Sequence, residues 1–445
     1  MDVVGIQGLM GYPVGSHIVS QYPPGMPALL ALFSLFGWKF ALGTNLFVHL
    51  ATFWVVACIL RKIKVPTVFA LLYLLDPTAV LYSRTLCSDM VAALCVTLAL
   101  YFQLVRRPGW CGACLGISFV FRTANLIAIP LMALAYFLVD YLQVRDGRKT
   151  APLHAAISAG RMLLGAGPPL ILAYVYQALV QHGGWSRYGG GFPPPSLAYL
   201  PQVFPKYVLY LSVIYPGMVF APLLYRGAGR TSIFLISYGF LFFYGSYYFM
   251  NMGRSFAEDV VAAPRLMIVV LPLFIVAYSD IIWRLVGATD SKLRLMAGAL
   301  CAAILFLVAI GLQKRHQQYL HEMDNARTAI LTRVQPQDVL LCNIHVAKLF
   351  HPAWGTRHYF LFGAAWKYDV NLRSAEDAIR AGLTRRNGSV FLADWSRDYR
   401  PETSDEVRCI SDLQRRFVVR EITPGAETGL PQGMVLIEFL AERAK

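Results

Sequence analysis

The chain has 445 residues, of which 57% are hydrophobic and only 15% are charged, and its mean hydropathy is +0.51. These values exclude a single soluble core and indicate a protein that crosses a membrane several times. The formal charge of +15 is uneven, because the stretch from Lys314 onward has 19 basic and 16 acidic residues, a net charge of +3. The other +12 therefore belongs to the apolar part of the chain.

The apolar segments in chain order predict about ten helical spans, at roughly 20 residues per crossing. They lie at 39–60, 65–83, 89–105, 110–143 with a split at Arg122, 161–181, 206–225, 231–250, 265–284 and 294–313. The predicted fold class is α: a polytopic transmembrane helical bundle, followed by a small C-terminal extracytoplasmic α/β domain.

Basic residues gather in short loops that fall on one side when the spans are threaded alternately. They are Arg61, Lys62, Lys64, Arg106, Arg107, Arg145, Arg148, Lys149, Arg161, Arg226, Arg230, Arg284, Lys292 and Arg294. Short loops rich in Lys and Arg face the cytoplasm, so the charge indicates orientation and not a nucleic-acid partner. The opposite loops then face outward: 1–38, 83–88, the region of Arg122, 182–205, 251–264 and everything after 313.

Three regions follow from this pattern. Residues 1–38 form an extracytoplasmic loop, in which 26–36 is too short to span the bilayer and predicts an interfacial helix. Residues 39–313 form the bundle. The predicted localisation is an integral, multi-pass protein of a plasma or inner membrane, or of the endoplasmic reticulum in a eukaryote.

Residues 314–445 are much more charged and have no long apolar run. Helix-like stretches at 316–333, 374–386 and 403–415 alternate with strand-like ones at 338–344, 389–393, 416–422 and 433–440, which predicts an α/β domain. Cys342 and Cys409 both lie in it, and whether they pair is open without geometry.

The polar residues of the extracytoplasmic face form a compact set of candidate site residues. They are Asp2, His17, Tyr22, Arg84, Asp89, Arg122, Tyr188, Arg254, Glu258, Asp259 and Arg265. Carboxylates there could deprotonate a hydroxyl, and arginines could neutralise a phosphate that leaves with negative charge. Such a set suits transfer of a sugar from a lipid phosphate.

Each candidate also has a structural interpretation. Arg122 and Arg265 stand at predicted helix boundaries and could extend to lipid head groups. Glu258 and Asp259 could be a solvated loop face. Arg84 and Asp89 could form a structural ion pair at a helix N-terminus, where an acid is favoured.

The glycine-rich loop around Tyr188 offers flat aromatic faces on which sugar rings stack, or a belt of aromatic residues at the membrane interface. His17 with Glu258 or Asp259 could hold a divalent ion, but no ligand spacing supports a metal, and no cofactor motif is present. We therefore predict no metal and no cofactor.

Several motifs occur in an order that resembles the GT-C superfamily of membrane glycosyltransferases. They are Tyr22-Pro23-Pro24-Gly25, Tyr82-Ser83-Arg84 with Ser88-Asp89, Gly116-Ile117-Ser118-Phe119-Val120-Phe121-Arg122-Thr123-Ala124-Asn125, and Pro264-Arg265. Within the superfamily, residues 1–313 are most similar to polyprenyl-phosphate-sugar-dependent transferases, the group that includes protein O-mannosyltransferases and aminoarabinose transferases.

The resemblance implies an inverting glycosyltransferase with a polyprenyl-phosphate-linked sugar as donor and a lipid, glycan or protein as acceptor, acting among membrane lipids at the extracytoplasmic face. It implies that Asp2 is the general base and Asp89 a supporting acid. Arg84, Arg122 and Arg265 would bind the carrier phosphate.

One departure from the family leaves alternatives open. The family places a transmembrane helix ahead of the loop with the catalytic acid, whereas this sequence starts inside that loop with Asp2 as its only early carboxylate. A truncated, non-catalytic relative is therefore one alternative. A lipid-linked glycan transporter is another, for which Asp76-Pro77 inside a predicted span is the best candidate feature.

Overall fold

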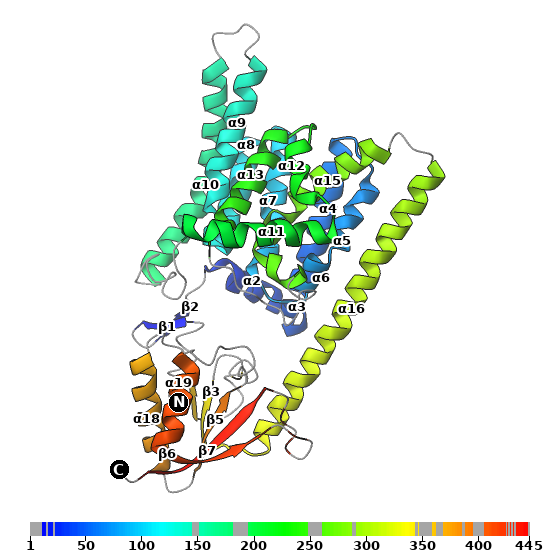
Figure 1. Ribbon diagram of the computed structural model, residues 1–445. Helices are drawn as coiled ribbons and strands as arrows, with labels where there is room; N and C mark the ends of the chain where they lie inside the picture. Colours follow the sequence, from blue (N-terminus) through cyan, green and yellow to red (C-terminus); the bar gives the residue numbers. More distant parts are fainter. Residues whose placement is uncertain are drawn as a thin grey trace. The chain divides into compact units, whose positions relative to one another are not determined.

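The computed structural model describes residues 11–14, 17–20, 23–144, 151–180, 195–247, 260–286, 291–342, 346, 358–361, 368–384, 388–394, 405–423, 425, 428, 430 and 433–443. The chain divides into two compact units, one comprising Pro23–Gln313 and the other comprising Met1–Tyr22 with Lys314–Lys445 (Figure 1). The predicted helical fold with a small C-terminal sheet is confirmed.

The first unit is helical throughout its described part. Its elements are α2 (Gly25–Ser34), α3 (Trp38–Leu42), α4 (Thr44–Lys62), η1 (Thr67–Ala70), α5 (Leu71–Leu74), α6 (Pro77–Tyr82), α7 (Ser88–Leu104), α8 (Pro108–Phe121), η2 (Thr123–Ile127), α9 (Ala128–Val144), α10 (Ala151–Val180), η4 (Leu197–Tyr199), α11 (Leu200–Ile214), η5 (Met218–Phe220), α12 (Ala221–Leu224), α13 (Arg230–Gly245), η6 (Ala263–Val269) and α15 (Leu271–Val286). Helix α16 (Ser291–Leu331) continues from this unit into the second.

Four described helices are long and apolar enough to cross a membrane: Thr44–Lys62, Thr123–Tyr141, Pro152–Leu179 and Leu197–Ile214. A fifth candidate is the pair Val260–Val269 and Leu271–Leu285, which is bent by 97°. The apolar helices Gly25–Ser34, Ser88–Leu104 and Pro108–Phe121 are shorter. The short helix predicted at 26–36 is present as α2, and the predicted split at Arg122 separates α8 from η2 and α9.

Three predicted spans are interrupted in the structure, and a proline stands at each interruption. The 65–83 stretch forms η1, α5 and α6, because Asp76 has extended backbone (φ −59°, ψ 123°) and Pro77 starts a new helix. The 206–225 stretch breaks at Tyr215-Pro216-Gly217, and the 265–284 stretch bends at Val270-Leu271-Pro272. Irregular backbone is tolerated at membrane depth only where protein surrounds it or where it lines a cavity.

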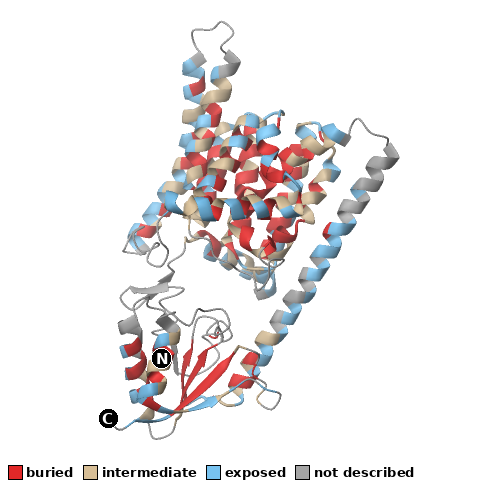
Figure 2. Ribbon diagram, in the orientation of Figure 1, coloured by how far each residue is buried: buried red, intermediate tan, exposed pale blue. Residues whose placement is uncertain are grey.

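Helices α8 and α10 pack closely through glycines. A Cβ on Gly112 would overlap the carbonyl oxygen of Met162, and one on Gly116 would lie 2.7 Å from that of Ala166. Buried residues are concentrated in the interior of the bundle (Figure 2). Helices α10 and α4 carry exposed apolar residues such as Leu164 and Trp54. Exposed apolar faces of this kind suit a lipid environment.

The second unit contains a five-stranded mixed sheet of order β4-β3-β5-β7-β6. The strands are β3 (Val339–Cys342), β4 (His358–Leu361), β5 (Val390–Asp394), β6 (Phe417–Ile422) and β7 (Val435–Glu442), and the helices are α18 (Tyr368–Leu383) and α19 (Asp405–Arg416). Strand β3 pairs in parallel with β4 and β5, and β7 pairs antiparallel with β5 and β6. The four predicted strands are present; β4 and the hairpin β1 (Gly11–Val14) and β2 (His17–Ser20) were not predicted.

Both faces of this sheet are covered. Leu341 and Leu392 pack with α18 and α19 on one face, whereas Leu340 and Phe391 pack with the end of α16 on the other. Cys342 belongs to the second face and Cys409 to the first, so the sheet separates the two thiols and they form no disulfide with each other. Burial raises the pKa of the Cys342 thiol to about 12, so this thiol stays protonated and unreactive at neutral pH.

We expect Gly112→Ala to destabilise the bundle by about 1–3 kcal/mol, because the added methyl group must push α8 away from α10. Thermal unfolding of the detergent-solubilised protein measures the loss. Gly160→Ala on α10 is the matched control, since nothing lies within 4 Å of its added Cβ. Equal melting temperatures for both variants would contradict the close packing.

Candidate functional site

A buried carboxylate stands at the start of α7. Asp89 lies in the first turn of that helix, and its side chain is only 1% exposed. The N-terminus of a helix favours a negative charge, but a carboxylate so deeply buried also needs direct partners. Two arginines provide them.

Arg122 and Arg265 each pair with one oxygen of Asp89. Arg122 Nη1 contacts Oδ1, and Arg265 Nε donates to Oδ2 at 2.9 Å. Arg122 is the C-cap residue that follows α8. Arg265 belongs to η6 and is 176 residues from Asp89 along the chain. One carboxylate thus joins three segments of the bundle. We call Asp89, Arg122 and Arg265 the ion cluster.

The ion cluster has one formal negative and two formal positive charges, so a net positive charge remains. The side chains of Arg122 and Arg265 are 18% and 39% exposed, in contrast to the buried Asp89. A guanidinium has five N–H donors, and Asp89 occupies only part of them. The arrangement is therefore suited to binding an anion, and a phosphate oxygen matches the fork of a guanidinium.

Two tyrosine rings hold the guanidinium groups in place. The Arg122 guanidinium carbon lies 5.4 Å from the centroid of the Tyr244 ring, and that of Arg265 lies 5.6 Å from the Tyr82 ring. Such cation–π contacts contribute about 0.5–2 kcal/mol, depending on desolvation. The Tyr82 hydroxyl donates to the Ala262 carbonyl oxygen at 2.8 Å, so α6 is tied to the segment that enters η6.

Hydrogen bonds from a side chain of α4 fix the backbone that precedes α7. Asn45 of α4 donates from its side-chain amide to the carbonyl oxygens of Thr85 and Cys87, the latter at 2.9 Å. Beyond α8, the Asn125 amide donates to the Ser118 hydroxyl at 2.6 Å. These buried amides hold the turns on both sides of the ion cluster, which limits the positions that Asp89 and Arg122 can adopt.

The structure brings three of the predicted site residues together and places the others as follows. Arg84 is exposed in the turn between α6 and α7. His17 belongs to β2, and its side chain is outside the described part of the structure. Asp2, Tyr22, Tyr188, Arg254, Glu258 and Asp259 lie outside the described residues. Among the residues that are described, no group of three His, Cys, Asp or Glu side chains is placed to hold a metal ion.

Sequence reasoning missed Tyr244, Asn45 and the ring contact of Tyr82. Tyr244 is one of many aromatic residues in an apolar helix, and nothing in its spacing distinguishes it. Asn45 had a usable signal, because an amide within an apolar span must find a hydrogen-bond partner.

The likeness of this chain to known proteins is one of three-dimensional structure and not of sequence. No protein-family model and no curated protein matches the sequence. The structure is similar to the crystal structure of ArnT from Cupriavidus metallidurans bound to undecaprenyl phosphate, with a TM-score of 0.57, 13% identity, and coverage of 94% of this chain and 88% of that chain. For ArnT from the same organism in the apo state, the TM-score is 0.55 at 14% identity, with 95% and 89% covered.

The class that this fold defines is a bundle of apolar helices of the membrane-spanning kind, followed by a small C-terminal α/β unit. The crystal structures of ArnT are among the solved structures that share it, and at such identities the likeness shows a common architecture. It extends over both the helical and the C-terminal units of this chain, because more than nine tenths of the residues are covered.

Asp89→Ala should destabilise the protein by about 1–3 kcal/mol, because it leaves the two guanidinium groups of Arg122 and Arg265 close together without a counter-charge. Thermal unfolding checks this expectation. Asp140→Ala is the control, since Asp140 pairs with Arg106, whose side chain is 61% exposed, and exposed pairs contribute at most about 1 kcal/mol. A larger loss for Asp140→Ala than for Asp89→Ala would refute a stabilising role of the ion cluster.

Proposed function

We propose that this protein is an inverting glycosyltransferase that moves a sugar from a polyprenyl-phosphate carrier to a lipid, glycan or protein acceptor. The observation that carries the proposal is the ion cluster, in which a buried carboxylate holds two partly exposed arginines with net positive charge. The shared architecture with ArnT, of which one structure is described as bound to undecaprenyl phosphate, supports the same class of donor.

In the proposed reaction, an acceptor oxygen forms a bond to the anomeric carbon as the bond from that carbon to the phosphate oxygen breaks. The acceptor's proton passes to a base, and the polyprenyl phosphate leaves with an additional negative charge. Arg122 and Arg265 would bind the phosphate and stabilise this charge as it develops, which is commonly the largest catalytic contribution. Asp89 would position both guanidinium groups.

The remaining roles are proposals from the resemblance. Arg84, exposed just before α7, would be a third phosphate-binding arginine. Asp2 would be the general base, and the aromatic loop around Tyr188 would face the sugar. The loops with these residues, together with the C-terminal α/β unit, would lie on the extracytoplasmic side, as the basic loops of the opposite side indicate.

Replacement of the arginines should weaken binding of the carrier. We expect Arg265→Ala and Arg122→Ala each to lower the affinity for undecaprenyl phosphate by about tenfold or more, because each loses charge-assisted hydrogen bonds. Native mass spectrometry with undecaprenyl phosphate in detergent measures this directly. Arg106→Ala, which removes an exposed arginine of a different pair, should bind normally, and a loss of affinity in that variant alone would contradict the site.

Turnover tests the reaction itself. Purified protein with a panel of polyprenyl-phosphate sugars should release polyprenyl phosphate in the presence of a suitable acceptor. Asp89→Asn keeps the size of the side chain, so it should lower turnover far more than membrane abundance, because misplaced guanidinium groups stabilise the leaving phosphate less well. Unchanged transfer by this variant would remove Asp89 from the mechanism, and lipid movement across vesicles without transfer would favour a transporter.

A further inference from the structure

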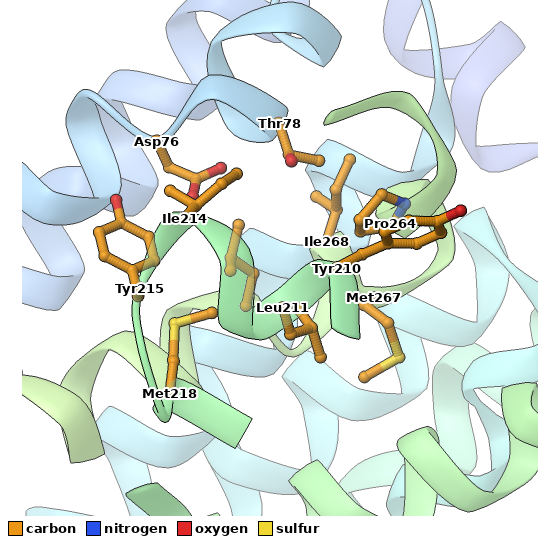
Figure 3. Close-up of a pocket in the computed structure, with 11 residues that line it drawn as sticks. Asp76, Thr78, Tyr210, Leu211, Ile214, Tyr215, Met218, Pro264, Met267 and Ile268 are labelled. Carbon is orange, nitrogen blue, oxygen red and sulfur yellow. The ribbon is translucent and has the colours of Figure 1, made fainter. Parts of the chain in front are cut away.

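A pocket in the bundle lies where the three interrupted helices meet. Its lining comes from Asp76 and Thr78 at the first interruption, from Tyr210, Leu211, Ile214, Tyr215 and Met218 at the second, and from Pro264, Met267, Ile268 and Leu271 at the third (Figure 3). The empty space in the pocket and at its mouth is about 280 Å³, a volume that includes open solvent. A pocket of this size receives one end of a ligand, not a whole lipid.

At each interruption the backbone departs from the conformation or direction of a continuous helix. Tyr215 has extended backbone (φ −124°, ψ 97°), and Gly217 after it is left-handed (φ 76°), a conformation that glycine adopts easily. The helices on the two sides of Val270 differ in direction by 97°. Interrupted helices that converge on one pocket inside a membrane protein are typical of a ligand-binding site.

Asp76 is the ionisable residue of this pocket. It is 1% exposed, and its Oδ1 accepts the backbone N–H of Ala79 at 2.8 Å, so it caps α6. The Tyr215 hydroxyl, which also belongs to the pocket lining, donates to the Leu72 carbonyl oxygen at 2.6 Å. A carboxylate has about four acceptor sites, so Asp76 can accept a further hydrogen from a bound group.

Capping alone does not explain an aspartate at this position. Serine, threonine and asparagine cap helices about as well, and none of them places an ionisable group among Leu211, Ile214 and Met218. A buried carboxylate within a membrane bundle is costly and usually belongs to a functional site.

We propose that the Asp76 pocket binds a hydroxyl or ammonium group carried on a short apolar stem. Asp76 accepts the hydrogen bond, and the side chains of Met218, Met267 and Leu271 surround the stem. The Asp76 carboxylate repels a phosphate. This pocket therefore favours a neutral or cationic group, whereas the ion cluster favours an anion. The proposal rests on the proposed function only in identifying this ligand with the glycosyl acceptor, which is then a lipid-borne alcohol or amine.

The test uses three photoreactive probes with the same diazirine-bearing C12 chain: an alcohol, a primary amine and a phosphate. Full-length protein in detergent is labelled with each probe, and labelled peptides are quantified by mass spectrometry. We expect the alcohol and the amine to label the segments around Met218 and Met267 more strongly than the phosphate does. Asp76→Asn, which retains a capping side chain, should reduce labelling by the amine about tenfold, because a charge-assisted hydrogen bond is lost.

Asp280→Asn is the matched control, because Asp280 lies on α15 and pairs with Arg284, outside the pocket lining. It should label as the unchanged protein does. Thermal unfolding of both variants checks that the fold is retained.

Two outcomes would overturn the proposal: equal labelling of Asp76→Asn and the unchanged protein, which leaves Asp76 as a cap, and dominant labelling by the phosphate probe. Affinity for undecaprenyl phosphate is measured on the same samples. Asp76→Asn should retain it, so failure of the pocket and failure of the donor site are distinguished.

Discussion

The bundle depends on one interaction, the pairing of the Asp89 carboxylate with Arg122 and Arg265. It joins the start of α7, the end of α8 and the 3-10 helix η6, which are separated by up to 176 residues. The carboxylate is fully enclosed, whereas the arginines reach the surface. Burial of the acid therefore converts two long, flexible side chains into fixed donors, and this is a form of preorganisation that an anion-binding site requires.

The same region contains the interrupted helices. Proline at positions 77, 216 and 272 prevents continuous spans, and the surrounding bundle supplies the hydrogen-bond partners that the freed backbone needs. Tyr82 bonds the Ala262 carbonyl, and Tyr215 bonds the Leu72 carbonyl. Tyrosine suits this purpose in an apolar interior, because its ring packs while its hydroxyl satisfies one backbone oxygen.

The sequence predicted those features that depend on local composition. Apolar length identified the helices, and four of the five strands in the C-terminal sheet were found because buried strands are short apolar runs between charged helices. The split at Arg122 and the cluster arginines followed from charge in an apolar context. In contrast, Tyr244, Asn45 and the separation of Cys342 from Cys409 by the sheet depend on distant packing that no local pattern contains. Residues 65–83 looked like one span because apolar content outweighed the Asp76-Pro77 signal.

Helix η6 connects the ion cluster and the Asp76 pocket. Arg265 extends from it to Asp89, while Pro264, Met267 and Ile268 of the same helix line the pocket of Asp76. With three residues per turn, Pro264 and Met267 share one edge of this helix, whereas Arg265 and Ile268 share another. A seven-residue element thus presents a cation to one site and an apolar wall to the other. A displacement of η6 would therefore move Arg265 and part of the pocket wall together, because both belong to one short helix.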